Sequence, residues 1–330
     1  MAGNGAAPLG DGDRGWTQRA PLNHGRGGLD AATVNRRILA IGGFDPQGPR
    51  GNNSVDFVEA RLNGGDGTWH DIAPLPVPRS NAQVAVLDGL VYVTGGVGPH
   101  HAELEGVVIF NPSPGSWQAG PDLPERRSAG AAATLNHWLY VAGGYVSTQQ
   151  SKPRETESVI SYNPKDQSWT SVAPMRQSRG FLRMVAAGGY LYAIGGNHAG
   201  NTVPTVERYN PTSDSWTTVD PMHQDRGVPG AVVTQNLIVV VGGTHIGDQS
   251  AILRSTEIYD LNIGKWRTLS AQLAQPRTSL ACALDESGAI LAIGGEVDGD
   301  GTTSASTAVE ALDLQEAARP VNDRHHQIPK

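Results

Sequence analysis

Short runs of consecutive apolar residues recur along the chain, and each run ends in a Gly-Gly doublet. Uninterrupted apolar runs of about four residues are typical of strands that are buried on both faces. The doublets follow one another at steps of 47 to 53 residues. They are Gly42-Gly43, Gly95-Gly96, Gly143-Gly144, Gly195-Gly196, Gly242-Gly243 and Gly294-Gly295. The pattern predicts a repeated unit built around one buried strand.

A tryptophan follows every doublet except the last. These residues are Trp69, Trp117, Trp169, Trp216 and Trp266. Between doublet and tryptophan lies a segment such as Val206-Glu207-Arg208-Tyr209, and then a stretch of turn-forming residues. We therefore expect four strands per unit, named A to D, in which strand B ends at the doublet and strand D carries the tryptophan.

The order of these features resembles the kelch-repeat family across roughly residues 13–314. The fourth unit is the clearest copy, with Gly195-Gly196, Val206-Glu207, Tyr209-Asn210-Pro211 and Trp216. A period near ~50 residues with four strands per unit is the pattern of this family. The resemblance implies an all-β fold, a six-bladed kelch β-propeller. Among eukaryotic proteins, the expected likeness is to the kelch domain of kelch-like proteins. The second unit departs from the pattern, because Val108 stands where Glu is usual.

The two ends of the repeat region complement each other. Trp16 has no doublet before it, whereas the sixth doublet is followed by Glu310 but by no tryptophan. We predict that the N-terminal strand pairs into the last blade and closes the ring, which would protect sheet edges. The predicted propeller spans residues 13–314, flanked by disordered segments at 1–12 and 315–330. The predicted blades are approximately 26–77, 78–125, 126–177, 178–224, 225–275, and 276–314 together with 13–22.

Composition narrows the class of protein. The net charge of −7 argues against general nucleic-acid binding. No apolar run approaches the ~20 residues of a membrane span, so no membrane association is expected. The N-terminus shows no secretory signal, and the single Cys282 cannot form an internal disulfide. These features favour a cytoplasmic location.

One arginine position repeats with the blades. An arginine lies ten residues after each of Trp16, Trp69, Trp117, Trp169 and Trp216, and eleven after Trp266. The arginines are Arg26, Arg79, Arg127, Arg179, Arg226 and Arg277. This position precedes the innermost strand, on the face that carries the long loops, so we expect an arginine-lined channel mouth that attracts anions. The alternative is a structural ring, in which each arginine pairs with backbone or acidic groups between blades.

The resemblance adds residues to this predicted site. In eukaryotic kelch proteins that bind acidic peptides, arginines and serines of this face make the contacts, and the matching serines here are Ser80, Ser128 and Ser279. Independently of the resemblance, Tyr145 lies just after its doublet, where it is placed either to stack on a ligand or to pack at the solvent edge. Arg183 adds a further charge along its strand.

Histidines form a second candidate cluster. His198 and His245 each lie two residues after a doublet, in neighbouring blades. With a carboxylate such as Asp45, Glu296 or Asp248, they would make a divalent metal possible, or an acid-base pair. The alternative is that they are exposed loop residues without function. No cofactor is predicted from any sequence motif.

Two functions fit these features. The first is a stand-alone kelch propeller that binds a small anionic ligand or an acidic protein segment at the mouth of its channel. The second is an enzyme, metal-dependent or metal-free, that acts on a small anionic substrate at the same mouth. The resemblance implies an isomerase or mutarotase, or a lyase or cyclase, for this second reading, because the family includes sialic-acid mutarotases.

Overall fold

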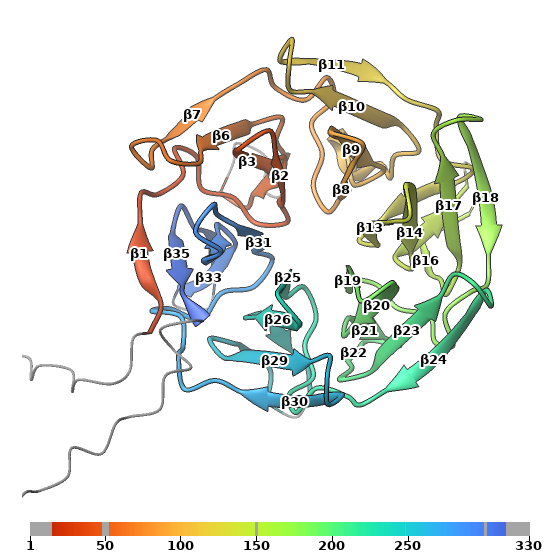
Figure 1. Cartoon of the computed structure of the whole chain (residues 1–330). Coiled ribbons are helices and arrows are strands. Elements are labelled where there is room, and N and C mark those ends of the chain that lie inside the picture. The colour runs from red at the N-terminus through yellow and green to blue at the C-terminus, as the bar shows by residue number, and fades with distance from the viewer. Residues whose placement is uncertain (1–14, 48–52, 149–150, 248, 300–301, 315–330) are drawn as a thin grey trace, which may run out of the picture.

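The chain forms a ring of small antiparallel sheets around a central axis (Figure 1). The computed structural model describes residues 15–47, 53–148, 151–247, 249–299 and 302–314. Within these residues there are six four-stranded sheets, which we number as blades 1 to 6. The predicted disorder at 1–12 and 315–330 lies outside the described residues.

Each blade places strand A nearest the axis and strand D at the rim, and every pairing is antiparallel. Blade 1 consists of β2 (Asp30–Val34), β3 (Arg37–Ile41), β6 (Val58–Leu62) and β7 (Trp69–Asp71). Blade 2 consists of β8 (Gln83–Leu87), β9 (Leu90–Thr94), β10 (Val107–Asn111) and β11 (Ser116–Ala119). Blade 3 consists of β13 (Ala131–Leu135), β14 (Trp138–Ala142), β17 (Val159–Asn163) and β18 (Ser168–Val172).

Blades 4 and 5 repeat this order, and blade 6 takes its outer strand from the N-terminal part of the chain. Blade 4 consists of β19 (Arg183–Ala187), β20 (Tyr190–Ile194), β23 (Val206–Asn210) and β24 (Ser215–Val219). Blade 5 consists of β25 (Gly230–Thr234), β26 (Leu237–Val241), β29 (Thr256–Asp260) and β30 (Lys265–Thr268). Blade 6 consists of β31 (Ala281–Leu284), β32 (Ile290–Ile293), β35 (Val309–Leu312) and β1 (Thr17–Arg19).

Strand β1 completes blade 6 by pairing with β35, with Thr17 opposite Ala311. The innermost strands of blades 6 and 1 lie side by side, as do those of every other neighbouring pair. The apolar residues gather in six clusters among the described residues, and each cluster combines side chains of two neighbouring blades. The core therefore lies between the blades rather than at the centre of the ring.

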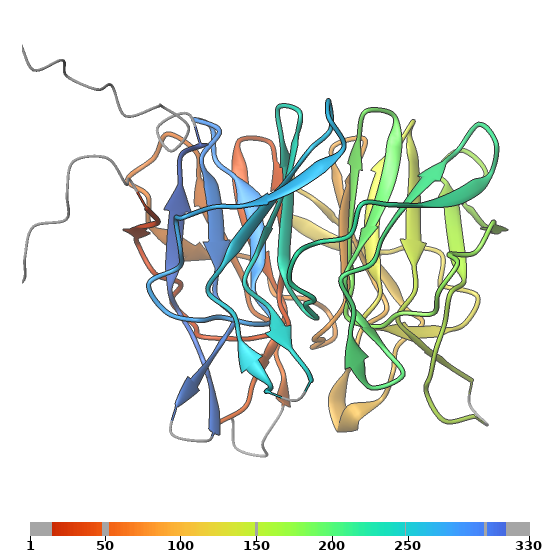
Figure 2. The same cartoon turned by 90° about the horizontal axis from the view of Figure 1, so that it is seen from below.

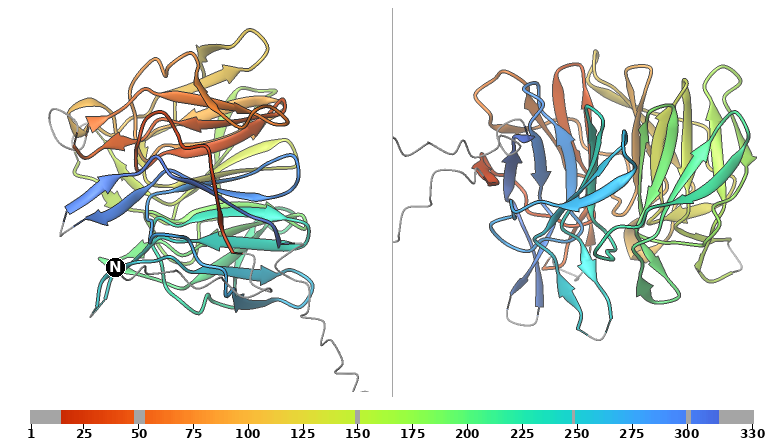
Figure 3. Two further views of the ribbon diagram at one scale, coloured as in Figure 1. Left: turned by 90° about the vertical axis from the view of Figure 1, so that its left-hand side faces the viewer. Right: turned by 60° about the horizontal axis from the view of Figure 1, so that its bottom comes forward.

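The long B–C connections lie on one side of the disc, which we call the loop face (Figures 2 and 3). Four contain short hairpins, formed by β4 (Phe44–Asp45) with β5 (Asn53–Ser54), β21 (Asn197–His198) with β22 (Asn201–Thr202), β27 (Thr244–His245) with β28 (Ala251–Ile252), and β33 (Glu296–Gly299) with β34 (Thr302–Ala305). The B–C connection of blade 2 holds the 3-10 helix η1 (Pro99–His101), and that of blade 3 holds β15 (Tyr145–Ser147) and β16 (Arg154–Glu155). Strand β12 (Arg126–Ser128), from the D–A connection between blades 2 and 3, pairs with β15 and completes a small sheet. The tight A–B turns lie on the opposite side, the turn face.

Candidate functional site

The six repeated arginines lie inside the blades and do not line the mouth. Five side chains have exposed fractions of 0%, and that of Arg79 is 2%. Each guanidinium donates to the carbonyl of the first doublet glycine in its own blade, over 2.6 to 3.0 Å. The predicted arginine-lined mouth is therefore wrong, because the doublet carbonyls hold these side chains within the sheets.

The backbone of each arginine meets the doublet of the preceding blade. In all six cases the second doublet glycine donates its N–H to an arginine carbonyl, at 2.7 to 2.9 Å. Gly42, in the first such doublet, has a φ of +59°, and a Cβ atom added there would lie 2.5 Å from the carbonyl oxygen of Arg79. The doublets are thus glycines because the chain of the next blade passes too close for a side chain. Arginine and doublet together connect adjacent blades around the ring.

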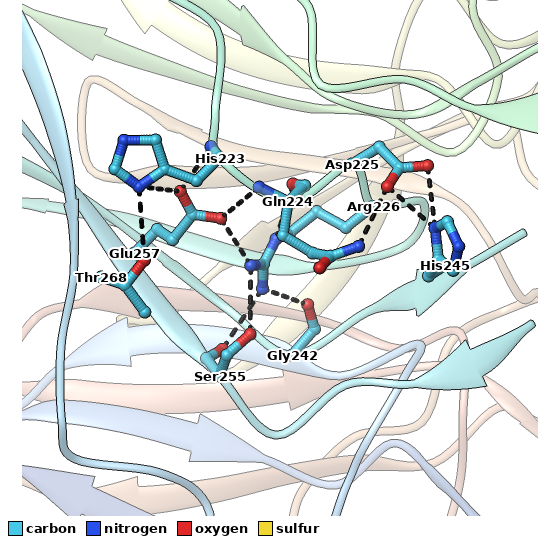
Figure 4. A network of polar contacts seen from close by, with 9 residues as sticks. All are labelled: His223, Gln224, Asp225, Arg226, Gly242, His245, Ser255, Glu257 and Thr268. Carbon is cyan, nitrogen blue, oxygen red and sulfur yellow. Dashed lines mark hydrogen bonds and ion pairs between the residues drawn. The ribbon is translucent and has the colours of Figure 1, made fainter. Parts of the chain in front are cut away.

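Four of the arginines pair with the glutamate of strand C in their own blade. The pairs are Arg26 with Glu59, Arg179 with Glu207, Arg226 with Glu257, and Arg277 with Glu310. Figure 4 shows one of them, in which Glu257 also accepts backbone N–H groups of His223 and Gln224. Burial lowers the pKa of each of these arginines, and the glutamate opposes the shift. These four pairs agree with the structural alternative of the sequence analysis in having acidic partners, but the partners lie in the arginine's own blade and not between blades.

Blades 2 and 3 lack this glutamate. Arg127 pairs instead with Glu125 at 3.0 Å, and burial still lowers its pKa to about 10. Arg79 has no carboxylate partner among the described residues and donates to the carbonyls of Gly95 and Gly106 at 3.0 and 2.9 Å. Burial alone lowers its pKa to about 10. Even this unpaired arginine is held by its own blade and turned away from the mouth.

The predicted serines are buried as well. The exposed fractions of Ser80, Ser128 and Ser279 are 3%, 4% and 7%. Ser128 donates to Glu103 at 2.7 Å. Ser80 and Ser128 directly follow their arginines, whereas Ser279 lies one residue further on and therefore occupies a different repeat position. The three serines do not form one surface.

The rim of the channel is built from that next position. Its members are Gly28, Asn81, Ala129, Phe181, Val228 and Ser279, all with φ between 50° and 59°. Each donates its N–H to the carbonyl of the same position in the preceding blade, at 2.7 to 3.1 Å, so that six hydrogen bonds run around the axis. A positive φ is costly for a β-branched residue such as Val228, and strain of this kind is concentrated at functional sites. We call these residues the mouth ring.

A small hollow lies at the mouth ring, and its lining includes Asn81, Phe181 and Arg183. The Tyr145 ring meets Phe181 edge-on, with the ring centroids 5.7 Å apart, and its hydroxyl donates to Glu155 at 3.1 Å. Burial raises the pKa of Tyr145 to about 12, and Glu155 adds to this shift. Tyr145 is therefore a neutral aromatic neighbour of the mouth at physiological pH.

Arg183 separates this hollow from a cavity further down the axis. It lines both spaces, and the lower one has a volume of about 150 Å³. Arg183 donates to the carbonyls of Pro229 and Leu280 at 2.6 and 3.0 Å, and it lies 3.5 Å from the carboxylate of Asp30. It is the only Lys or Arg side chain among the described residues lining these two spaces.

The two histidines have separate partners. His198 Nδ1 lies 2.8 Å from the carbonyl oxygen of Ser178, and His245 Nδ1 lies 2.8 Å from a carboxylate oxygen of Asp225 (Figure 4). No group of three His, Cys, Asp or Glu side chains that could hold a metal occurs among the described residues. Asp248 lies outside them. The structure therefore does not bring His198 and His245 together as metal ligands.

A ring of four-stranded sheets around a narrow axial channel defines the class of β-propellers. The model of the family described as "Kelch motif" matches residues 78–124, 126–176, 178–223 and 229–271, which together make up more than half of the chain. The chain belongs to the kelch family.

Comparisons with known proteins agree with this assignment. Kelch-like protein 40 of Xenopus tropicalis is 27% identical over 198 residues, 58% of this chain and 31% of that protein. The human Influenza virus NS1A-binding protein is 33% identical over 85 residues, 26% of this chain and 12% of that protein. Kelch-like ECH-associated protein 1B of Danio rerio is 33% identical over 81 residues, 24% of this chain and 14% of that protein. These matches span less than a third of the relatives' own length.

A solved structure titled "Structure of YjhT" has the same fold. The TM-score is 0.75 at 18% identity, and the alignment covers 93% of this chain and 98% of that one. Among the described residues, no helix has the length and apolarity needed to cross a membrane. The cytoplasmic location stays a prediction.

Proposed function

We propose that this kelch propeller binds a segment of another protein on its loop face, and that the segment is acidic and enters the mouth of the channel. Kelch repeats are typical of protein-binding propellers, and two of the relatives bear names that describe binding to or association with another protein. Long loops on a rigid ring are where binding residues usually lie.

The observation that carries the proposal is the composition of the mouth. Phe181 and its neighbour Tyr145 offer aromatic surface, Asn81 offers an amide, and Arg183 forms a cationic floor. Aromatic residues and arginine supply much of the binding energy at protein interfaces. The favoured anion contact thus moves from the six buried arginines to the mouth, where a carboxylate side chain of the partner would find both apolar and charged groups.

The test measures the binding of synthetic peptides to the wild type and to variants with a substitution on one or the other face of the disc. We expect peptides rich in Asp and Glu to bind, and matched Asn and Gln peptides to bind at least about tenfold more weakly. Phe181→Ala should weaken binding at least about tenfold, as loss of an interface anchor does. Trp138→Ala, on the turn face, is the matched control and should leave binding unchanged. Equal binding of the acidic and amide peptides, or equal effects of the two substitutions, would contradict the proposal.

An enzyme acting on a small anionic substrate is the second candidate, because of one pair of residues. The His245 imidazole is 26% exposed on the loop face, and Asp225 orients it at 2.8 Å. A histidine held by a carboxylate in this way can act as a general base. Turnover of a sugar acid, followed by NMR, that is lost in His245→Ala but retained in His223→Ala would favour an isomerase. Absence of turnover across a panel of sugar acids would remove this candidate.

A further inference from the structure

The axial cavity holds an opposed pair of charges. Arg183 and Asp30 each lie four residues after the repeated arginine of their blades, Arg179 and Arg26, so they occupy the same repeat position in blades 4 and 1. In a ring of six, these two blades face each other across the axis. The other blades carry Gln83, Ala131, Gly230 and Ala281 at this position. The pair is therefore specific to one diameter of the ring and is not part of the repeat.

The guanidinium of Arg183 is held in place by backbone, not by its acidic partner. Carbonyls from blades 5 and 6 accept from Nε and Nη2, whereas the contact with Asp30 is 3.5 Å long. A direct charged hydrogen bond is about 2.7–2.9 Å. Of the five N–H groups of an arginine, two have no acceptor among the described residues. The position of Arg183 is thus fixed while part of its hydrogen-bonding capacity stays unused.

The space below Arg183 is open and lined by small groups. Ala131, Ala231 and Cys282 contribute to its wall, together with backbone at the start of the innermost strands. Its volume of about 150 Å³ is enough for several water molecules or one small organic acid. Asp30 faces this cavity with 22% of its side chain exposed, although it lies deep inside the ring.

We propose that the axial cavity is a binding site for a small carboxylate, which enters through the mouth and replaces Asp30 as the partner of Arg183. This deepens the proposed function and rests on it for the mouth as the entrance. The carboxylate can belong to a free small acid or to an Asp or Glu side chain of a protein segment. The chemistry of recognition is the same in both cases, since a guanidinium fork with free N–H groups suits either.

Charge balance in the cavity requires that a proton is taken up when the carboxylate binds. With an incoming carboxylate, two anionic groups face one guanidinium, so the cavity stays neutral only if Asp30 takes up H⁺. Burial raises the pKa of Asp30, and Arg183 opposes this shift. Among the described residues that line the cavity, the one other titratable group is Cys282. Burial raises the pKa of its thiol to about 12, Arg183 and Arg277 oppose this shift, and Asp30 adds to it. Binding should therefore strengthen as the pH falls toward the pKa of Asp30.

The test uses acetate as the probe, at constant ionic strength, with the full chain. Isothermal titration calorimetry at pH 6, 7 and 8, in buffers of different ionisation enthalpy, measures affinity and proton uptake together. We expect acetate to bind more tightly at pH 6 than at pH 8, with uptake of protons. Asp30→Asn should bind acetate roughly tenfold more tightly than wild type at pH 8, the change that one pKa unit of coupling represents, and without pH dependence. Arg183→Met should lose binding.

Arg208→Met is the charge-matched control, since Arg208 stacks over the Tyr190 ring on strand C, away from the axis. It should bind acetate as wild type does. Acetate binding that survives in Arg183→Met, or that is unchanged in Asp30→Asn, would overturn the inference. If Arg183→Met does not fold, the Asp30→Asn result decides alone.

A parallel titration with an acidic peptide separates this inference from the proposed function. Acetate binding without peptide binding supports the cavity site for a free acid and contradicts the protein partner. Peptide binding that is equal in wild type and Asp30→Asn, with no acetate binding, overturns the cavity site and leaves the protein partner standing.

Discussion

The buried arginines differ in whether a strand C glutamate accompanies them, and two sequence positions in each blade reflect this difference. In blades 1, 4, 5 and 6, the strand C glutamate also accepts the backbone N–H of the residue three before the arginine. In blades 2 and 3, where the glutamate is missing, that residue is Pro76 or Pro124. Proline has no N–H to donate. The glutamate and the donor it requires are thus present together or absent together.

Removing the arginine should therefore cost more where it leaves a glutamate behind. We predict that Arg179→Met lowers the free energy of unfolding by about 3–5 kcal/mol, because Glu207 is left as an unpaired buried charge. Arg79→Met should cost about 1–3 kcal/mol, since it leaves only carbonyl groups without a donor. Urea unfolding of both variants measures the difference. Equal losses would show that the carboxylate contributes little to the cost.

The arginines also show that the spacing of residues along the chain does not predict the direction in which a side chain points. Their period located the repeat position correctly, but the direction of a side chain depends on the acceptors within its reach, and the doublet carbonyls lie inside the blade. A signal was present: Glu59, Glu207, Glu257 and Glu310 recur with the same period and supply the opposite charge. Arg183, which is specific to one blade, is the arginine that reaches the channel.

At the scale of the strand, the repeated tryptophans join neighbouring blades. Trp216 is 5% exposed, and its indole N–H donates to the carbonyl of Ala173, in blade 3, at 2.8 Å. Trp117, Trp169 and Trp266 make the same kind of bond to the preceding blade, and Trp69 to the residue after β1. These contacts place the aromatic ring of strand D against the neighbouring blade.

We predict that Trp216→Ala lowers the free energy of unfolding by about 3–5 kcal/mol, the cost of truncating a buried aromatic side chain. Trp138→Ala should cost under about 1 kcal/mol, because this ring is 36% exposed at the start of strand B. Chemical denaturation of the two variants under one set of conditions makes the comparison. Similar costs would contradict the assignment of Trp216 to the core.

Strand β1 has a testable role of its own. It covers the edge of β35, and Leu22, just after it, is 3% exposed in the cluster between blades 6 and 1. Deletion of residues 1–22 should lower the melting temperature by at least about 5 °C, because an edge and an apolar cluster lose their cover. Deletion of residues 1–12, which leaves β1 in place, is the control. A 1–22 deletion that melts with the control would refute this role for the strand.

At the scale of the molecule, the fold followed from the sequence and the site only in part. The repeat specified the strands and their order, because the doublet serves a contact that every blade makes and a tryptophan recurs at every strand D. The strand C glutamate adds a further contact in four of the six blades. The mouth ring and the pair of Asp30 with Arg183 depend on residues that differ between blades, so no period reveals them. Aligning the six blades position by position would have set Arg183 beside Asp30, Gln83, Ala131, Gly230 and Ala281.

The axial charge pair should also make the free energy of unfolding of the whole ring depend on pH. The pKa of Asp30 is raised by burial, so the folded state holds its proton more tightly than the unfolded chain does. Wild type therefore loses stability as the pH rises from the unfolded value near ~4 through the folded pKa. Asp30→Asn should escape this loss, so that its stability relative to wild type grows over that window and then levels off. Urea unfolding between pH 4 and 8 measures it. A constant difference across the window would contradict the raised pKa.

The pairing of β1 with β35 has a consequence for the order of the chain. In blade 4, strands C and D are joined by residues 211–214, between β23 and β24. In blade 6, the same junction would join Leu312 to Thr17, which lie at the start of one antiparallel pairing. Strands β35 and β1 thus lie side by side at a place that the other blades cross with a short turn. A gene cut at any of those turns, and spliced here by a short turn, would encode a circular permutant of the same ring.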